Sequence, residues 1–530
     1  MFEKKDVLGP HFNQFNKSPN IVFIIVEGLN DDFINDYHGI EWMPFLNELS
    51  SKSLYWNHCL TLGERSFAAV PSLIGSLPFG EKGFTLLNRY PLHQTLPSIL
   101  KSNGYYTTFY YGQGAWFHQK DLFFKYNNLD LIFDNTCFHP KYSKIIVGSD
   151  QFFWGYNDKD LFSQSLEVID TLSAKKRLDI YFTGSSHNPF VISNKLGYQE
   201  KYRALVKLKS NKDEKQFFKT YEKYLITLPF VDDAFKDLFS NYRKREDFQN
   251  TIFIITGDHP MTEVPIANSL KRYHVPLLIY SPKLKSAKVF TEVVSHLDVF
   301  ETLLSYLDNY QIKIPKTSTA LGGSLIVGEK MAEKKLAFMN DNREVVDYLK
   351  GDYYLTDDKL FKVSKGFEIL PIEDKFIKNG MLAELLNYNK TRLYVSLKDA
   401  LLPVLNFYQN HGFQNIKIFD SIMDIMGSNQ YFDLIKELPI KNEKFHIHVS
   451  FDYEIPLGNN VQLIYQINSN KDSTIKWNSE GISPESAQYQ HQFEIAKLPI
   501  DQNSLKLKLF IWNEKKEKII LKNFKILVYR

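Results

Sequence analysis

The sequence has 530 residues, of which 44% are hydrophobic and 24% charged, with a formal net charge of +3. This length is too great for one typical domain and predicts two or three. The composition is ordinary for a globular protein. The nearly balanced charge, with basic residues spread along the chain, excludes the strongly basic surface of a nucleic-acid-binding protein. The two cysteines, Cys59 and Cys137, form neither a disulfide framework nor a zinc-binding spacing.

The start of the chain shows no recognisable targeting signal. No apolar run approaches the roughly 18 residues that a membrane span requires. Residues 1–18 lack the apolar centre of a signal peptide. We therefore expect a soluble chain as given, with residues 1–18 as a lead segment.

From about residue 20 to 310, short apolar runs alternate with amphipathic stretches. Helices are expected over 43–54, 95–104 and 228–244, and the strand-like runs are IVFIIVEG (21–28), YYTTFYYGQG (105–114), LDIYFTGSSHNPF (178–190), TIFIITGDHP (251–260) and VPLLIYSP (275–282). Strands and helices that alternate at this spacing predict an α/β fold with a mostly parallel sheet sandwiched by helices.

The rest of the chain has a different pattern. Within 331–440, residues 350–363 predict an antiparallel pair, and 391–412 predict a helix that ends at a glycine. We expect this region to complete the first domain and connect it to the next. Residues 441–530 contain strand-like runs separated by turns and predict a β-sandwich-like domain. This domain could serve for packing or as a spacer, or it could bind a glycan or a partner.

Several predicted strands end on residues that bind metals. Glu27 follows the first strand, where it is either a site residue or a polar residue emerging into solvent. Asp258 and His259 follow another strand and offer a carboxylate and an imidazole, which suit Zn²⁺ or Mn²⁺. His187 follows a third, where a single histidine also suits a surface or capping position. Because parallel strands end at one edge of a sheet, these side chains could form one polar cluster.

Ser66 lies where LTLGERSFAAVPSLIGSLP (60–78) predicts a turn and then a helix. Taken alone, Ser66 suits the N-cap of that helix. Beside Glu27, Asp258 and His259 it suits a nucleophile better, because a bound cation would lower the pKa of its hydroxyl. Arg65 would either contact a phosphate or face solvent.

Four motifs occur in a characteristic order: NIVFIIVEGLN (20–30), LGERSFAAVPSLIGSLP (62–78), TGSSHNPF (183–190) and TGDHP (256–260). Together they resemble the sulfatase-like branch of the alkaline phosphatase superfamily, and most closely the lipoteichoic acid synthase group of phosphoglycerol transferases. WGYNDKDLF (154–162), RYHVPLLIYSP (272–282) and SHLDVFETLLSYL (295–307) support the resemblance. It covers residues 19–330, which it implies are a catalytic domain, and leaves the C-terminal region unassigned.

The resemblance implies a metal site and a nucleophile. Glu27, Asp258 and His259 match metal ligands, and Ser66 matches the nucleophile that also contacts the metal. The family usually has threonine at the position of Ser66, and serine keeps the hydroxyl. Pro260 replaces what is often a longer polar residue, which puts one contact behind the metal ligands in doubt.

The resemblance also implies substrate contacts. His187 matches a histidine that faces the substrate or its leaving group, where imidazole could protonate the leaving oxygen. His118 and Lys120 fall in a region of polar and aromatic substrate contacts. Arg65, next to the nucleophile, is a natural neighbour of a phosphate.

The implied function is a metal-dependent phosphoryl-group transferase or phosphodiesterase. Its cofactor would be one divalent cation, Mn²⁺ or Zn²⁺ in preference to Mg²⁺. A lipid-headgroup phosphodiester would be the donor, and a glycan, lipid or water hydroxyl the acceptor. The family works at the extracytoplasmic face of the membrane in the cell envelope, so we expect a membrane anchor outside this chain.

Other functions remain open. A phosphoethanolamine transferase would share the metal site, and an inactive module that binds lipid or a partner belongs to another class. An inactive member is expected to lose metal ligands, yet all four are present here. Sulfate-ester hydrolysis is not expected, because RSFAAVPSL (65–73) lacks the C/S-x-P-x-R motif that is converted to formylglycine.

Overall fold

A computed structural model describes residues 5–172, 175–207, 209, 211–315, 318–326, 334–397, 401, 417–420, 425–482, 488–495, 497–500 and 503–529. The chain forms two compact units. The first consists of residues 1–87 and 93–401, and the second of residues 88–92 and 402–530. Within the described residues, no helix is both long enough and apolar enough to cross a membrane.

The first unit is built on a nine-stranded sheet with the order β10-β2-β9-β8-β1-β7-β3-β4, in which β11 also pairs with β2. Every pair is parallel except those of β9, which is antiparallel to both β2 and β8. The strands are β1 Asn20–Val26, β2 Leu54–Leu60, β3 Tyr106–Tyr111, β4 Leu131–Phe133, β7 Arg177–Phe182, β8 Thr251–Gly257, β9 His274–Tyr280, β10 Lys288–Phe290 and β11 Val294–Ser295. The expected α/β fold with a mostly parallel sheet is confirmed.

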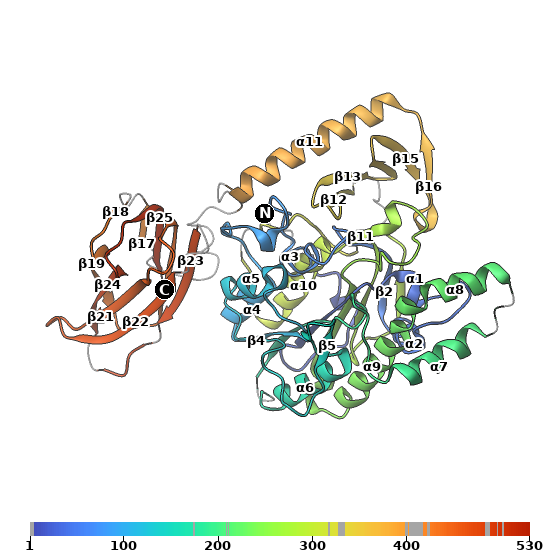
Figure 1. Ribbon diagram of the computed structural model, residues 1–530, viewed down its shortest axis with the longest axis horizontal. Coiled ribbons are helices and arrows are strands. Elements are labelled where there is room, and N and C mark those ends of the chain that lie inside the picture. Colours follow the sequence, from blue (N-terminus) through green and yellow to red (C-terminus); the bar gives the residue numbers. More distant parts are fainter. Residues whose placement is uncertain are drawn as a thin grey trace. The chain divides into compact units, whose positions relative to one another are not determined.

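Helices cover both faces of this sheet, which explains why β1 is apolar and buried along its whole length. Its Val22, Ile24 and Val26 pack in one core with side chains of α2, α6 and α9. Figure 1 shows α3, α4, α5 and α10 on the other side of the sheet. The helices are α1 Asp31–Ile34, α2 Pro44–Ser50, α3 Ala69–Gly75, α4 Leu96–Ser102, α5 Lys120–Tyr126, α6 Asp158–Asp170, α7 Lys195–Val206, α8 Lys212–Leu225, α9 Thr227–Tyr242 and α10 Leu297–Leu307.

A second, antiparallel sheet completes this unit. Its strands follow one another in the order β12 Lys335–Met339, β13 Val345–Lys350, β14 Tyr353–Thr356, β15 Lys359–Val363 and β16 Ile369–Ile372. The antiparallel pair expected within 350–363 is β14 with β15. Helix α11, Lys375–Leu397, begins well before the helix expected at 391–412, and residues 398–400 and 402–412 of that prediction lie outside the described residues. A short hairpin, β5 Ile145–Val147 with β6 Phe152–Gly155, lies elsewhere in the unit.

The second unit is all-β, as expected for the C-terminal region. One sheet has the order β17-β25-β20-β23 with β18 on β25, and the other has the order β19-β24-β21-β22. Apolar residues of both sheets form a single core, which is the organisation of a β-sandwich. The strands are β17 Lys417–Asp420, β18 Ile425–Gly427, β19 Tyr431–Lys441, β20 Phe445–Glu454, β21 Val461–Asn468, β22 Thr474–Ile482, β23 Gln488–Ile495, β24 Ser504–Asn513 and β25 Ile519–Tyr529.

The β unit starts earlier than the expected boundary at residue 441. Strand β19 pairs with β24 along most of its length, so residues 431–441 belong to the sandwich and not to a connector. The alternating pattern of β19 is interrupted by register shifts between Asp433 and Leu438, which hides the strand in the sequence.

Candidate active site

The register of β1 and β8 brings Glu27 and Asp258 together. Val26 is paired with Gly257, and the N–H of Asp258 donates to the carbonyl of Val26 at 3.1 Å. Each carboxylate is therefore the first residue after its strand, at the same edge of the sheet. The neighbouring strand β7 contributes as well, because the N–H of Glu27 donates to Oγ1 of Thr183 at 3.0 Å.

Glu27, Asp258 and His259 form a buried cluster of potential metal ligands. One ligand atom from each lies within 4.8 Å of the others. Nε2 of His259 is 3.5 Å from Oε1 of Glu27 and 3.3 Å from Oδ2 of Asp258. Two carboxylates and an imidazole are a suitable donor set for a divalent cation.

Asp258 presents one oxygen that has no partner. Its Oδ1 accepts from the N–H groups of Gly28 at 2.9 Å and His259 at 2.8 Å. Its Oδ2 is fully buried and has no hydrogen-bond donor among the residues that the structure describes. A buried carboxylate oxygen without a partner is costly, and a cation in the cluster would satisfy it.

The orientation of His259 also fits a metal. Its Nδ1 lies 2.8 Å from the carbonyl oxygen of Pro260, so we assign the proton to Nδ1. Nε2 then directs its lone pair toward Glu27 and Asp258, the arrangement found in metal-binding histidines. The backbone carbonyl of Pro260 thus supports His259 from behind. Pro260 has no polar side chain, and its carbonyl takes the place of the contact that such a side chain would make.

The cluster is electrostatically unfavourable by itself. Burial and the nearby Asp258 raise the pKa of Glu27 to about 8, although His259 and Lys120 act in the opposite direction. Without a cation, Glu27 therefore tends to keep a proton at neutral pH. A bound cation would favour the ionised carboxylate.

Ser66 faces this cluster and does not cap a helix. Its Oγ is 3.4 Å from Oε2 of Glu27 and 3.4 Å from Nε2 of His259. The expected helix start at Ser66 is wrong, because α3 begins at Ala69 and its N-cap, Ala68, makes no side-chain cap. The serine lies in the turn before the helix, and its hydroxyl is therefore available to the cluster.

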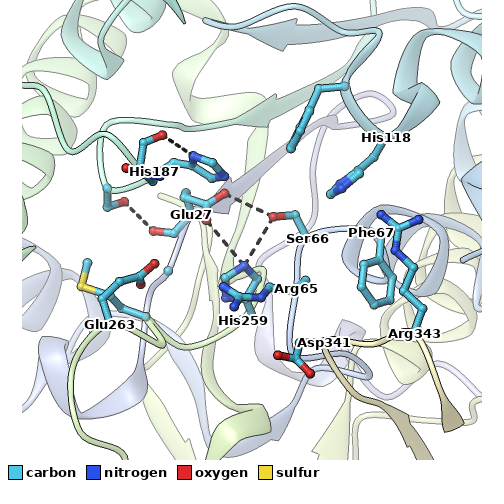
Figure 2. Close-up of a pocket in the computed structure, with 15 residues that line it drawn as sticks. Glu27, Arg65, Ser66, Phe67, His118, His187, His259, Glu263, Asp341 and Arg343 are labelled. Carbon is cyan, nitrogen blue, oxygen red and sulfur yellow. Dashed lines mark hydrogen bonds and ion pairs between the residues drawn. The ribbon is translucent and has the colours of Figure 1, made fainter. Parts of the chain in front are cut away.

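The cluster opens into a cavity of about 380 Å³, which is large enough for a small ligand. Glu27, Ser66 and His259 line this cavity together with Arg65, His118 and His187 (Figure 2). Arg65 donates from Nη1 to Oγ1 of Thr262 at 2.9 Å, which holds its guanidinium at the cavity wall. Arg65 therefore faces the cavity, and its contact with a phosphate stays a prediction.

His187 is held with one nitrogen toward the cavity. Its Nδ1 lies 2.6 Å from the carbonyl oxygen of Asn188, and its ring stacks on Trp154 with centroids 5.3 Å apart. Phe117 meets the same ring edge-on at 6.0 Å. These contacts fix the imidazole, and Nε2 is the nitrogen that a substrate can reach.

The position of His187 depends on Asp158 at the start of α6. Oδ1 of Asp158 accepts from the N–H groups of Gly184 at 2.8 Å and Ser185 at 3.2 Å. Oγ of Ser185 accepts in return from the N–H of Asp158 at 2.9 Å. The loop that carries His187 is therefore anchored to a helix rather than left to solvent.

The expectation that Lys120 contacts the substrate does not fit its position in the structure. Its side chain is 2% exposed and is not among the residues that line the cavity. Nζ donates to the carbonyl of Phe117 at 3.1 Å and lies 4.9 Å from the centre of the Tyr111 ring and 5.0 Å from that of Phe182. Burial lowers the pKa of Lys120 to about 8 despite the attraction of Glu27 and Asp258. Lys120 therefore acts on the carboxylates from behind the cavity wall.

Three charged residues of the cavity were missed by sequence reasoning. Glu263 follows the strand β8 motif, while Asp341 and Arg343 come from the turn between β12 and β13. The only local signal was the polar run NDNRE (340–344) between two apolar segments, which indicates a turn but not where the turn docks.

A comparison of the sequence with models of protein families shows to which family the chain belongs. The model of the family described as Sulfatase matches residues 19–310, more than half of the chain. The chain belongs to the sulfatase family. All residues of the cavity except Asp341 and Arg343 fall inside the matched sulfatase region.

Individual relatives of this sulfatase-family chain carry names from the lipoteichoic acid synthase group. The chain is 22% identical over 399 residues to the lipoteichoic acid synthase-like protein YvgJ of Bacillus subtilis, covering 70% of this chain and 59% of that protein. It is 28% identical over 266 residues to lipoteichoic acid synthase of Staphylococcus aureus, covering 47% of this chain and 37% of that protein. The chain thus spans less than two thirds of these relatives' own length. The resemblance to this group is confirmed.

Solved structures show the same fold. The lipoteichoic acid synthase LtaP of Listeria monocytogenes has a TM-score of 0.56 at 16% identity, covering 72% of this chain and 93% of that one. A protein of the alkaline phosphatase superfamily from Vibrio parahaemolyticus has a TM-score of 0.53 at 22% identity, covering 72% and 89%. Family membership and the named relatives together support an enzyme of the phosphoryl- or sulfuryl-transfer type.

Proposed function

We propose that this chain transfers a phosphoryl-containing group from a lipid-headgroup phosphodiester to a hydroxyl acceptor, with Ser66 as covalent nucleophile. The observation that carries the proposal is the position of the Ser66 hydroxyl in the cavity, 3.4 Å from both Oε2 of Glu27 and Nε2 of His259. A serine used only to cap α3 would point its hydroxyl toward the helix N–H groups instead.

Glu27, Asp258, His259 and Ser66 would hold one divalent cation. The unpartnered Oδ2 of Asp258 and the Nε2 lone pair of His259 support this assignment. When bound, such a cation supplies Lewis acidity toward a phosphoryl oxygen and lowers the pKa of a nearby hydroxyl. Mn²⁺ or Zn²⁺ suits this mixed oxygen and nitrogen set better than Mg²⁺, which prefers oxygen ligands and water.

The chain's own residues can carry out both halves of the transfer. Ser66 loses its hydroxyl proton to solvent and attacks phosphorus, forming an Oγ–P bond as the bond to the leaving oxygen breaks. His187, in its protonated form, gives a proton to that oxygen. An acceptor hydroxyl then gives its proton to His187 and attacks phosphorus, and the Oγ–P bond breaks as Ser66 regains a proton from solvent. Two half-reactions at one site predict ping-pong kinetics.

Phosphoryl transfer is favoured over sulfuryl transfer for this member of the sulfatase family. Counted from Ser66, the C/S-x-P-x-R motif for formylglycine formation needs a proline at position 68 and an arginine at position 70, where this chain has Ala68 and Val70. The similarity to proteins named lipoteichoic acid synthases supports a phosphodiester donor in a lipid headgroup. On the same support, we propose that the reaction takes place at the outer face of the cytoplasmic membrane.

The catalytic part of the chain extends past residue 330 in this proposal. Arg343 lines the cavity from the turn that joins β12 and β13 of the antiparallel sheet, so we include this part of the chain in the site. For the C-terminal β unit, which has an apolar core of its own, we propose a spacer or partner-binding role.

A paired substrate assay tests this function. With Mn²⁺ or Zn²⁺ present, the chain should release p-nitrophenol from a p-nitrophenyl phosphodiester of glycerol at least about 100-fold faster than from p-nitrophenyl sulfate, in kcat/KM. Faster release from the sulfate ester would contradict phosphoryl transfer. No release from either substrate, with the cation demonstrably bound, would contradict the enzyme proposal.

A further inference from the structure

Arg343 occupies an unusual backbone position. It lies in the turn between β12 and β13 with a φ of 65°, a left-handed conformation that residues other than glycine rarely adopt. Its N–H donates to the carbonyl of Asn340 at 3.0 Å, and the N–H of Glu344 donates to Oδ1 of Asn340 at 2.9 Å. The turn is thus closed by its own hydrogen bonds, and the conformation of Arg343 is fixed. Residues held in such conformations are common at functional sites.

The turn is attached to the segment that carries Ser66. The N–H of Met339 donates to the carbonyl of Leu62 at 2.9 Å, and the N–H of Glu64 donates to the carbonyl of Met339 at 3.1 Å. The N–H of Asp341 donates to Oε2 of Glu64 at 3.1 Å. The partners of these bonds, Leu62 and Glu64, lie four and two residues before Ser66. The position of the turn is therefore coupled to that of the nucleophile.

The Arg343 guanidinium stacks on an aromatic ring, but its charge is not paired with a carboxylate among the described residues. It lies over the ring of Phe67, with 5.4 Å from its central carbon to the ring centre. Among the described residues it has no hydrogen bond and no ion pair, although Asp341 and Glu263 line the same cavity. A guanidinium stacked on an aromatic ring with its N–H groups unused is well prepared to bind an anion.

Arg343 and His187 lie on opposite sides of the nucleophile. Figure 2 shows His118, Phe67 and Arg343 on one side of Ser66, and His187 and Glu263 on the other. Burial, Lys120 and Arg343 lower the pKa of His118 to about 3, so this histidine is neutral at ordinary pH. Among the described residues that line the cavity on the side of Ser66 away from His187, Arg343 is therefore the one that carries a positive charge. Phe67 follows Ser66 directly in the chain, so a guanidinium that stacks on its ring lies near the nucleophile.

We propose that Arg343 is a specificity-determining residue that binds a second phosphate group of the substrate, on the side of Ser66 away from His187. The inference rests on the proposed function, because it assumes that a first phosphoryl group lies at Ser66. It narrows the substrate class to compounds with two phosphates joined by a short linker. Either a terminal phosphate monoester or the next phosphodiester of a longer chain has this chemistry.

Calorimetric binding tests the inference without requiring turnover. Glycerol 1-phosphate and glycerol 1,3-bisphosphate are titrated into the full chain with Mn²⁺ present, and a dimer of glycerol phosphate joined by a phosphodiester is a third ligand. The bisphosphate or the dimer should bind at least about tenfold more tightly than the monophosphate, as expected for a charge-assisted contact. Whichever of the two binds more tightly identifies a monoester or a diester as the second group.

Two variants of the same turn separate charge from structure. Arg343→Gln should remove the preference for two phosphates and leave the affinity for glycerol 1-phosphate within about twofold. Asn342→Ala, at an exposed neighbour that does not line the cavity, should change neither affinity. An equal loss for both ligands in Arg343→Gln, or no loss for either, would overturn the inference.

The outcome is separable from that of the proposed function. Hydrolysis of the p-nitrophenyl phosphodiester of glycerol is measured in parallel with the binding experiments. A chain that shows the Arg343-dependent preference but hydrolyses no phosphodiester keeps the second phosphate site and contradicts the proposed reaction. A chain that hydrolyses the phosphodiester but has no preference for two phosphates contradicts the site alone.

Discussion

Nε2 of His259 lies 3.4 Å from Oγ of Ser66, while Nδ1 of the same ring is occupied by the carbonyl of Pro260. The histidine therefore presents an unprotonated nitrogen to the serine, beside Glu27. Because α3 begins three residues later, at Ala69, the serine has no structural task in the helix. In the proposed function this hydroxyl is the nucleophile, and its removal should have little effect on folding.

The nucleophile is tested by Ser66→Ala and Ser66→Thr. Ser66→Ala should lower kcat for a phosphodiester by at least about 1,000-fold, because the variant lacks the hydroxyl that we propose forms the covalent adduct. Its Tm should change by less than about 3 °C, since no helix cap is lost. Ser66→Thr keeps the hydroxyl and should retain measurable turnover. Near-normal turnover by Ser66→Ala in steady-state kinetics would contradict the covalent mechanism.

Removal of divalent cations tests the ligand cluster. Chelation should abolish activity and lower Tm, and Mn²⁺ or Zn²⁺ should restore both. Below about pH 8, Glu27 of the cation-free protein binds a proton that the cation must displace. The apparent affinity should therefore fall by about tenfold for each pH unit below about 8. Calorimetric titration measures this dependence, and an affinity that is constant with pH would argue against Glu27 as a ligand.

His187 is tested by the quality of the leaving group. His187→Gln should slow the release of an alkoxide leaving group by about 100-fold or more, because an alkoxide needs a proton. Release of p-nitrophenolate, which leaves without a proton, should slow by less than about tenfold. Ser66→Thr, by contrast, should affect both substrates similarly. If His187→Gln slowed both reactions equally, a role in binding rather than in proton transfer would follow.

Asp158 gives a pH-dependent effect on stability. Burial raises its pKa to about 6, above the ordinary value of 3.8, so the folded state binds the proton more tightly than the unfolded state. The free energy of unfolding contributed by this group is therefore highest at low pH and is lost as pH rises through about 6. Asp158→Asn keeps an acceptor for Gly184 and Ser185 but cannot ionise. Between about pH 4.5 and about pH 8, the wild type should lose about 2 kcal/mol relative to this variant.

Urea unfolding at both pH values measures the difference between the wild type and Asp158→Asn. The assay compares one chain with its isosteric variant, so other titrating groups largely cancel. A difference that is the same at both pH values would mean that Asp158 titrates normally in the folded state.

The strand ends of the site could be predicted because each is a local feature. Glu27 follows an apolar run that is now β1, and Asp258 with His259 follows a similar run that is now β8. Parallel strands that are neighbours in a sheet must end side by side, so the sequence pattern was enough to bring these residues together. Their roles as metal ligands stay predictions.

Features that depend on tertiary contacts could not be predicted. Arg343 reaches the cavity only because its turn docks on residues 62–64, hundreds of positions earlier in the chain. The strand β2 was missed because the polar Asn57 and His58 interrupt it, where the pairing with β9 shifts register between Trp56 and Cys59. The helix start at Ser66 was wrong because the hydroxyl binds the cluster rather than the helix.

The most direct test of the account is detection of the covalent adduct on Ser66. The chain is mixed with excess glycerol phosphodiester and Mn²⁺, quenched in acid within one turnover, digested, and analysed by tandem mass spectrometry. The account predicts a phosphoglycerol adduct on Ser66 in the wild type, formed faster than product is released in the second half-reaction, and no adduct in Ser66→Ala. Turnover without any adduct on Ser66, or an adduct on a different residue, would contradict it.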